Sequence, residues 1–325
     1  MKTPPTIQEI QKWLIQENPL GVFIAEDFTI KDIDPKPWSG HFNFLVFTEN
    51  KKYVLRFKGP EWGEPKGIVD EYEMLIAVGK YKVAPRALYL SKDFFGEPMM
   101  LQEYVEGIMF SDIDEKGQKE LFTHVSHFIA EINSIKLSTE LLAKQEQLMG
   151  YEQNKKIWRE RLKIILGNPH TKEWGERVKE ILSQAEAMLD TFENRLKKVF
   201  EKSGPVFVFK SAHAGHLIKT EDGFRFFNWE KNGYGDPSFS LAVFLASMST
   251  RSDFETIKAD MIDAYLERKN IPEFKELIEQ RLNEREVSNL LWVLWNRANK
   301  IDAGVIENDS GITERFIRVK NILGI

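Results

Sequence analysis

The spacing of apolar residues changes near Gly107, and this change constrains the fold more than any other feature of the sequence. Before Gly107, short runs alternate between apolar and polar residues, as in strands with one buried face. After it, apolar residues recur at the spacing of amphipathic helices. The sequence therefore predicts an α+β protein with a sheet-containing domain over residues 1–105 and a larger, mainly helical domain over residues 106–325.

The first domain is expected to hold an antiparallel sheet and one internal helix. Turn residues separate its apolar runs, and the segment from Thr48 to Lys51 is expected to connect two strands as a hairpin. The predicted order is helix 7–16, strands 22–33, 42–47 and 53–58, helix 66–80, and strands 86–91 and 99–105.

The second domain is expected to be helical except for one insert. The predicted helices cover 116–135, much of 151–201, 240–248, 253–268 and 274–300. The insert, residues 204–237, has an extended start, a loop of small and polar residues and an aromatic strand at 224–229. Binding and catalytic residues concentrate in loops held by a rigid scaffold, so we expect the chemistry in this insert.

The long C-terminal helix carries two patterns. Arg281 and Glu284 lie three residues apart among other charged residues, which favours a solvated, charged face. Leu291, Trp292 and Trp295 form an apolar stripe at helical spacing, which is more often core than a binding surface.

Charge and composition exclude several classes of function. The chain has 45 basic and 50 acidic residues, for a net charge of −5, so no nucleic acid partner is expected. It has no cysteine, which excludes disulfides and thiolate chemistry. The N-terminal segment does not resemble a signal peptide and no apolar run is long enough to span a membrane, so we expect a cytoplasmic protein without a membrane partner.

Six short motifs follow one another along the chain. They are Tyr53-Val-Leu-Arg56, Asp70-Glu-Tyr-Glu-Met-Leu75, Val83-Ala-Pro85, Met99-Met-Leu-Gln-Glu-Tyr-Val-Glu-Gly107, Asn228-Trp-Glu230 and Gly235-Asp-Pro237. Their order and spacing resemble the aminoglycoside phosphotransferase and choline kinase family over nearly the whole chain. The resemblance implies a two-lobed protein-kinase-like fold, with a small antiparallel-sheet N-lobe plus one helix and a larger helical C-lobe.

The resemblance also implies a nucleotide site, with ATP or another nucleotide as the ligand. Arg56 falls where the family often has a lysine that neutralises phosphates, and Glu71 falls on its carboxylate partner. Gly40 lies in the loop that would cover the phosphates, and backbone groups of Glu103 and Val105 lie where the family holds the adenine edge. A structural ion pair and a plain connecting turn are the alternatives for Arg56 with Glu71 and for the Gly40 loop.

The catalytic pattern of the family is broken in this chain. The family histidine falls on Phe209, the base aspartate on Ser211, the metal-binding asparagine on His216 and the metal-binding aspartate on Asn228, while a further aspartate falls on Ser240. Phosphoryl transfer needs carboxylates to hold magnesium and to orient the attacking hydroxyl. We therefore expect very weak or no phosphotransfer, and magnesium binding is in doubt.

Two other chemistries are weighed for the same residues. His216 and Asn228 with Glu230 and Asp236 are weak candidates for a transition-metal site, although Glu230 more simply serves the structure and Asp236 caps the following helix. A hydrolase would pair Ser211 with a histidine and Asp236, but the Gly-x-Ser-x-Gly pattern is absent.

Three functional hypotheses remain open. The leading one is a catalytically impaired pseudo-phosphotransferase that binds a nucleotide, another small molecule or a protein partner, with the small ligand in the cleft between the lobes. The second is an active ATP-dependent small-molecule kinase with relocated catalytic residues. The third is an interaction scaffold that binds no ligand there.

Overall fold

Two compact packing units make up the chain in the computed structural model, which describes residues 5–24, 27–33, 41–59, 67–271, 273–300 and 309–325. The first unit comprises Met1–Gln118, Ile135–Lys144 and Ser211–Asn232, and the second comprises Lys119–Ser134, Gln145–Lys210 and Gly233–Ile325. The loop that carries Ser211, His216 and Asn228 therefore packs in the same unit as the N-terminal sheet. The expected lobe boundary at residue 105 stays a prediction.

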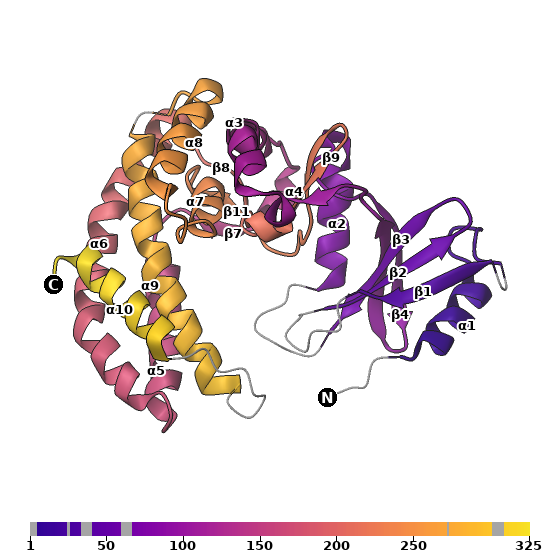
Figure 1. Cartoon of the computed structure of the whole chain (residues 1–325), viewed down its shortest axis with the longest axis horizontal. Helices are drawn as coiled ribbons and strands as arrows, with labels where there is room; N and C mark the ends of the chain where they lie inside the picture. Colours follow the sequence, from indigo (N-terminus) through magenta and orange to yellow (C-terminus); the bar gives the residue numbers. More distant parts are fainter. Residues whose placement is uncertain (1–4, 25–26, 34–40, 60–66, 272, 301–308) are drawn as a thin grey trace. The chain divides into compact units, whose positions relative to one another are not determined.

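A five-stranded antiparallel sheet forms the centre of the first unit (Figure 1). Its strands are β1 (Phe28–Asp32), β2 (His41–Thr48), β3 (Lys52–Lys58), β4 (Ala87–Phe94) and β5 (Glu97–Glu103), in the order β1-β2-β3-β5-β4. The first strand begins at Phe28 rather than at Val22 as predicted. Phe23 instead buries its ring, and its N–H donates to the Asn18 side chain at 2.9 Å, so the chain turns before it pairs.

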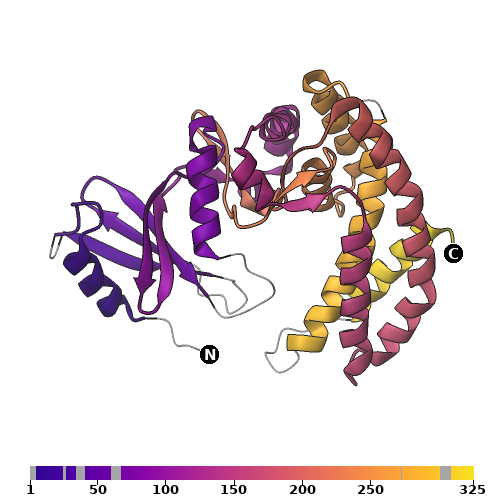
Figure 2. The same cartoon turned by 180° about the vertical axis from the view of Figure 1, so that it is seen from behind.

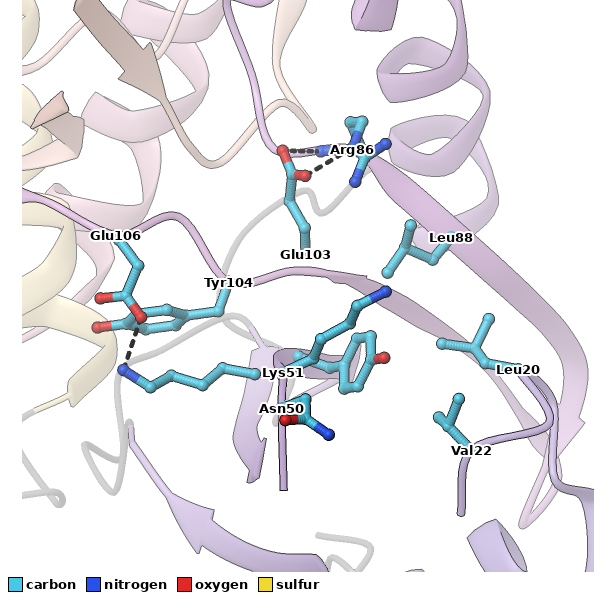
Figure 3. A pocket seen from close by; sticks show the side chains of 11 residues that line it. Leu20, Val22, Asn50, Lys51, Arg86, Leu88, Glu103, Tyr104 and Glu106 are labelled. Atoms are coloured by element: carbon cyan, nitrogen blue, oxygen red, sulfur yellow. Dashed lines mark hydrogen bonds and ion pairs between the residues drawn. The ribbon is translucent and has the colours of Figure 1, made fainter. Parts of the chain in front are cut away.

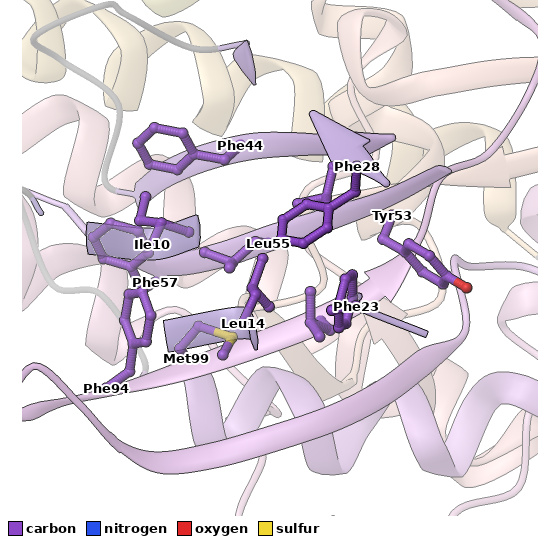
Figure 4. Packing of buried hydrophobic residues seen from close by; sticks show 12 residues of the cluster. Ile10, Leu14, Phe23, Phe28, Phe44, Tyr53, Leu55, Phe57, Phe94 and Met99 are labelled. Atoms are coloured by element: carbon purple, nitrogen blue, oxygen red, sulfur yellow. The ribbon is translucent and has the colours of Figure 1, made fainter. Parts of the chain in front are cut away.

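Helices cover both faces of this sheet. Helix α1 (Ile7–Glu17) begins with a capping box, in which Thr6 and Glu9 each satisfy the other's backbone N–H. Its apolar face, with Ile10 and Leu14, packs on the face of the sheet that carries most of the aromatic side chains (Figure 4). Helix α2 (Ile68–Val78) packs against β3, β4 and β5. Side chains alternate along a strand, so neighbouring β3 residues face α1 and α2 in turn.

The remainder of the first unit is built from short elements. They are the 3₁₀ turns η1 (Gly79–Tyr81), η2 (Phe110–Asp112) and η3 (Ala214–His216), helix α4 (Thr139–Ala143), and the strands β6 (Ile108–Met109), β9 (Leu217–Thr220) and β10 (Gly223–Phe226). The three strands form a sheet in the order β10-β9-β6. Gly107 lets the backbones approach, because a Cβ there would lie 2.3 Å from the Lys219 carbonyl oxygen.

The second unit is mainly helical, as predicted. Its helices are α3 (Glu115–Ile132), which starts in the first unit, α5 (Glu152–Gly167), α6 (Lys172–Ser203), α7 (Phe239–Ala246), α8 (Phe254–Arg268), α9 (Phe274–Lys300) and α10 (Asp309–Leu323). Long helices α5, α6 and α9 pack side by side with α10 across them (Figure 2). Among the helices of the described residues, none is both long enough and apolar enough to cross a membrane.

A small sheet connects these helices to the Gly-Asp-Pro motif. Strands β7 (Glu146–Leu148), β11 (Asn232–Gly235) and β8 (Val206–Phe209) pair in the order β7-β11-β8, with β11 parallel to β7. Gly235 has φ +149°, and a Cβ there would lie 2.3 Å from the Leu148 carbonyl oxygen. Glycine is therefore required where the motif passes β7.

Candidate functional site

Arg56 is the centre of a buried polar cluster in the first unit. Its Nε donates to Glu71 Oε2 at 2.8 Å, and its Nη1 donates to Asn43 Oδ1 at 3.1 Å. Its Nη2 contacts His41 Nδ1 at 3.0 Å and donates to Asn228 Oδ1 at 2.8 Å. The residue is only 7% exposed, so four partners hold one guanidinium in place. The predicted ion pair with Glu71 is confirmed.

Glu71 connects this guanidinium to the loop after β10. The residue is 2% exposed, and its Oε1 accepts the Trp229 backbone N–H at 3.0 Å. Asn228, just before it, has φ +69°, a left-handed conformation that asparagine tolerates better than most residues. This turn ends the strand at Phe226, before the predicted end at Trp229. It directs the Asn228 amide toward Arg56.

A neutral histidine links Arg56 to Glu230. A guanidinium only donates, so His41 Nδ1 accepts from Arg56 and the ring proton is on Nε2, which lies 3.4 Å from Glu230 Oε2. Burial, with the positive charges of Arg56 and Lys231, lowers the pKa of His41 to about 2. Burial also raises the pKa of Glu230. Glu230 Oε2 thus faces a neutral imidazole across a distance that is longer than a good hydrogen bond.

The positions of the catalytic loop are occupied by groups that bond to the loop itself. His216 Nδ1 lies 3.0 Å from the Ser211 carbonyl oxygen, and His213 Nδ1 accepts the Gly215 N–H at 3.0 Å. Ser211 therefore meets the His216 ring through its backbone carbonyl, which is not the geometry of a hydroxyl nucleophile with its base. Burial lowers the pKa of His216, so this ring is neutral near pH 7.

In the second unit, Phe209 and Ser240 serve the structure. Both are buried, and the Phe209 N–H donates to Ser240 Oγ at 3.1 Å. A hydroxyl and a backbone amide thus pair at the two positions where the resemblance predicts a histidine and an aspartate.

The segment from Glu103 to Gly107, which begins at the end of β5 and is called the hinge below, differs from this cluster in its hydrogen bonding. Glu103 donates its backbone N–H to the Arg86 carbonyl at 2.9 Å, and its carboxylate accepts from Arg86 Nε at 2.7 Å. The backbone N–H of half-buried Val105 has no hydrogen-bond partner within the described part of the chain. Gln102 is 8% exposed, and its amide also has no partner there. Gly40 lies outside the described residues.

Asp236 belongs to a buried network in the second unit, which corrects one sequence expectation. Its carboxylate accepts from the Ser238 N–H at 2.8 Å and from both Nε and Nη2 of Arg281, at 2.9 and 2.5 Å. Arg281 also donates to Glu284 at 3.2 Å, and both residues are 1% exposed. The prediction that Arg281 and Glu284 form a solvated face is therefore wrong, because Asp236 supplies a buried partner from a distant segment. The N-cap of α7 is Ser238, which makes no side-chain capping bond, and the Asp236 carboxylate accepts from Ser238 itself and not from an N–H of the helix, so the predicted capping role of Asp236 is wrong.

The aromatic stripe on α9 is split between core and surface. Leu291 is fully buried, whereas Trp292 is 49% exposed, and Trp295 lies under the Arg161 guanidinium at 6.0 Å. Helix α9 thus turns only part of this stripe inward.

The residues weighed as a metal site, His216, Asn228, Glu230 and Asp236, do not form one in the described part of the chain. No group of three or more histidine or acidic side chains in the described part of the chain is arranged to hold a metal ion. Glu71 and Glu230, the carboxylates near Asn228, face Arg56 and His41 respectively.

Sequence reasoning missed three members of the site. Asn43 is the register partner of Arg56 across β2 and β3, and His41 lies two residues away on the same face. A predicted hairpin register would have found both. Gln102 lies opposite Val54 on β3, on the face that carries Arg56, but nothing in the sequence indicates that its amide has no partner within the described part of the chain.

The comparisons with known proteins agree with this architecture. Residues 35–277 match the model of the phosphotransferase enzyme family. Choline kinase from Cryptosporidium parvum Iowa II has a TM-score of 0.70 and 14% identity over 97% of this chain and 95% of its own. Spectinomycin phosphotransferase, solved with ADP and spectinomycin, has a TM-score of 0.64 and 12% identity over 99% and 98%.

A bacterial structure extends the likeness. Choline kinase LicA from Streptococcus pneumoniae has a TM-score of 0.62 and 16% identity over 98% of each chain. No curated protein sequence matches this chain. The family model covers well over half of the chain, and the solved structures share its kinase-like fold; the chain therefore belongs to the phosphotransferase enzyme family.

Proposed function

We propose that this chain is a pseudo-phosphotransferase, which binds a nucleotide or a related small molecule without transferring phosphate. The observation that carries the proposal is the 2.8 Å hydrogen bond from Arg56 Nη2 to Asn228 Oδ1. It joins a fixed cation to the position where relatives of this family would hold a metal ion with an aspartate.

Charge explains why this contact opposes catalysis. A divalent ion bound at Asn228 would lie roughly 4 Å from the guanidinium, where a +2 and a +1 charge repel by about 8 kcal/mol at an effective dielectric constant of about 20. The neutral amide offers no charge to offset this repulsion. Ser211 cannot act as a base near neutral pH, and His216 is a poor magnesium ligand. The guanidinium takes the place of the metal charge.

The hinge supports retained ligand binding. The Val105 N–H and the Gln102 amide, which have no hydrogen-bond partner among the described residues, can both bond to the edge of a planar base. The solved relatives include a phosphotransferase with ADP bound. We infer that nucleotide affinity here depends little on magnesium. We place the protein in the cytoplasm, as the sequence leads us to expect.

The first experiment separates binding from turnover. Purified protein is screened by thermal shift against ATP, GTP and ADP with and without magnesium, and is assayed for phosphotransfer to aminoglycosides, choline-like amines and sugars. A ligand at about 100 times its Kd stabilises by about 2.7 kcal/mol. We expect equal stabilisation with and without magnesium, and no turnover. Stabilisation that requires magnesium would refute the lost metal site, and no shift with any nucleotide would favour the scaffold.

A restoration series tests the reason for inactivity. Ser211→Asp, His216→Asn and Asn228→Asp together rebuild the family carboxylates, but in this structure the new carboxylate at position 228 would pair with Arg56. We therefore expect magnesium-dependent nucleotide binding from the triple variant only when Arg56→Lys is added, because groups that act as a unit are not additive. The matched control is Arg56→Lys alone. Wild-type turnover that survives Ser211→Ala would instead establish an active kinase with relocated residues.

A further inference from the structure

A pocket opens on the first unit beside the hinge, on the face of the sheet opposite Arg56 (Figure 3). Its volume is about 470 Å³, and it is lined by residues from the segment before β1, the β2–β3 turn, β3, β4 and the hinge. Tyr53 of β3 lines it, and strand alternation places Tyr53 and Arg56 on opposite faces. The pocket is therefore separate from the buried polar cluster.

Tyr53 supplies a polar group that the fold leaves unused. The residue is 5% exposed and belongs to the core beneath α1, with its ring 5.8 Å from that of Phe23. No group in the described part of the chain hydrogen-bonds to its hydroxyl, and Tyr53 lines the pocket. Tyrosine hydroxyls usually have a partner when the ring is buried. A ligand in the pocket would provide it.

The charges around the pocket leave one cation in excess. Lys52 pairs with Glu106 at 2.6 Å, and Arg86 pairs with Glu103 at 2.7 Å. Within the described residues, the Lys51 ammonium forms no ion pair, although Lys51 lines the same pocket. An anionic group would neutralise it.

One wall of the pocket is aliphatic. Leu20, Val22 and Leu88 lie on one side, and Tyr104 and Glu106 lie on the other (Figure 3). Aliphatic side chains bind the apolar body of a ligand, while a few polar groups fix its orientation. We propose that this pocket binds a small amphipathic carboxylate, with the carboxylate between the Tyr53 hydroxyl and the Lys51 ammonium and the apolar body against the aliphatic wall.

The experiment uses the full chain and three probes of one shape: 3-phenylpropionate, its neutral amide and the corresponding amine. Binding is measured by calorimetry at low salt, and methyl NMR of Leu20, Val22 and Leu88 locates it. We expect the carboxylate to bind, to shift these methyl signals and to exceed both analogues in affinity. Added salt should weaken it, because an exposed cation contributes.

Two variants assign the contacts. Tyr53→Phe keeps the ring and removes only the hydroxyl, and it should weaken carboxylate binding roughly 10-fold, as for a hydrogen bond to a charged group. Lys51→Gln should weaken binding about 3-fold and reduce its salt dependence. The matched control is Lys12→Gln, at an exposed lysine on α1, which should bind as wild type does.

Three outcomes would overturn the proposal. They are binding of the amide as tight as that of the carboxylate, full affinity in Tyr53→Phe, and no methyl shift at saturating carboxylate. None of these depends on nucleotide binding at the hinge, so this proposal and the proposed function fail independently.

Discussion

Replacing Arg56 with lysine tests whether the buried guanidinium organises the site. Lysine keeps the positive charge that Glu71 requires, but it has three donors on one nitrogen where arginine has five on a planar fork. Four partner residues surround Arg56 in the structure, at 2.8 to 3.1 Å. An ammonium with three donors cannot serve four partners, so at least one acceptor loses its hydrogen bond. An unsatisfied buried acceptor costs about 1–3 kcal/mol, so Arg56→Lys should lower the free energy of unfolding by at least roughly 1–3 kcal/mol.

Urea denaturation, followed by fluorescence and circular dichroism, measures this change. Arg56→Met is the comparison, because it leaves Glu71 buried without a cation and should cost about 3–5 kcal/mol. Adding Glu71→Gln to that variant should recover part of the loss. If Arg56→Lys unfolds within about 0.5 kcal/mol of wild type, ordinary for a surface change, the guanidinium contacts do not organise the cluster and the reasoning is refuted.

Three further perturbations test other parts of the structure. The pKa of His41 falls from 6.5 to about 2 on folding. Between these two pH values the unfolded chain binds a proton at His41 and the folded chain does not, so the free energy of unfolding decreases as the pH falls below about 6.5. His41→Gln should remove about 2 kcal/mol of the loss between neutral pH and about pH 5, and an unchanged slope of stability against pH would contradict a buried neutral ring. Gly235→Ala should destabilise by more than about 2 kcal/mol because of its contact with β7, measured by urea unfolding with Gly79→Ala, where a Cβ meets nothing, as the control. Arg281→Met should cost about 3–5 kcal/mol by leaving Asp236 and Glu284 buried without a cation, and a change confined to a fraction of 1 kcal/mol would show that they protonate or rearrange instead.

The sequence predicted much of the fold because local patterns determine it. The strands of the N-terminal sheet, helix α1 and the long helices follow from apolar periodicity, and the Arg56 to Glu71 pair follows from motif positions. Helix α10 was missed. The early end of the aromatic strand at Phe226 was also missed. The left-handed turn at Asn228 that ends it depends on the Trp229 N–H, which donates to Glu71 on the distant helix α2.

The candidate site was predictable only in part, for a physical reason. The motif resemblance predicts which residues fall on the catalytic positions of the family, but it does not report what those residues touch. The contact of Arg56 with Asn228 joins residues 172 positions apart. The burial of Arg281 depends likewise on Asp236, which is 45 positions away. Long-range pairing of charged groups decides whether a charge is solvated or buried, and helical spacing alone does not contain that information.

The four contacts of Arg56 have a consequence for how such a site could change over generations. Under the proposed function, an aspartate introduced at position 228 alone would pair more strongly with the arginine and so would leave the metal site unformed. A mutation of Arg56 alone leaves buried acceptors unpaired and lowers stability. On that proposal, each single substitution toward a catalytic site is either without effect or harmful to stability. The effects of the two positions therefore depend on each other, and activity would need coordinated changes that selection on single mutations rarely supplies.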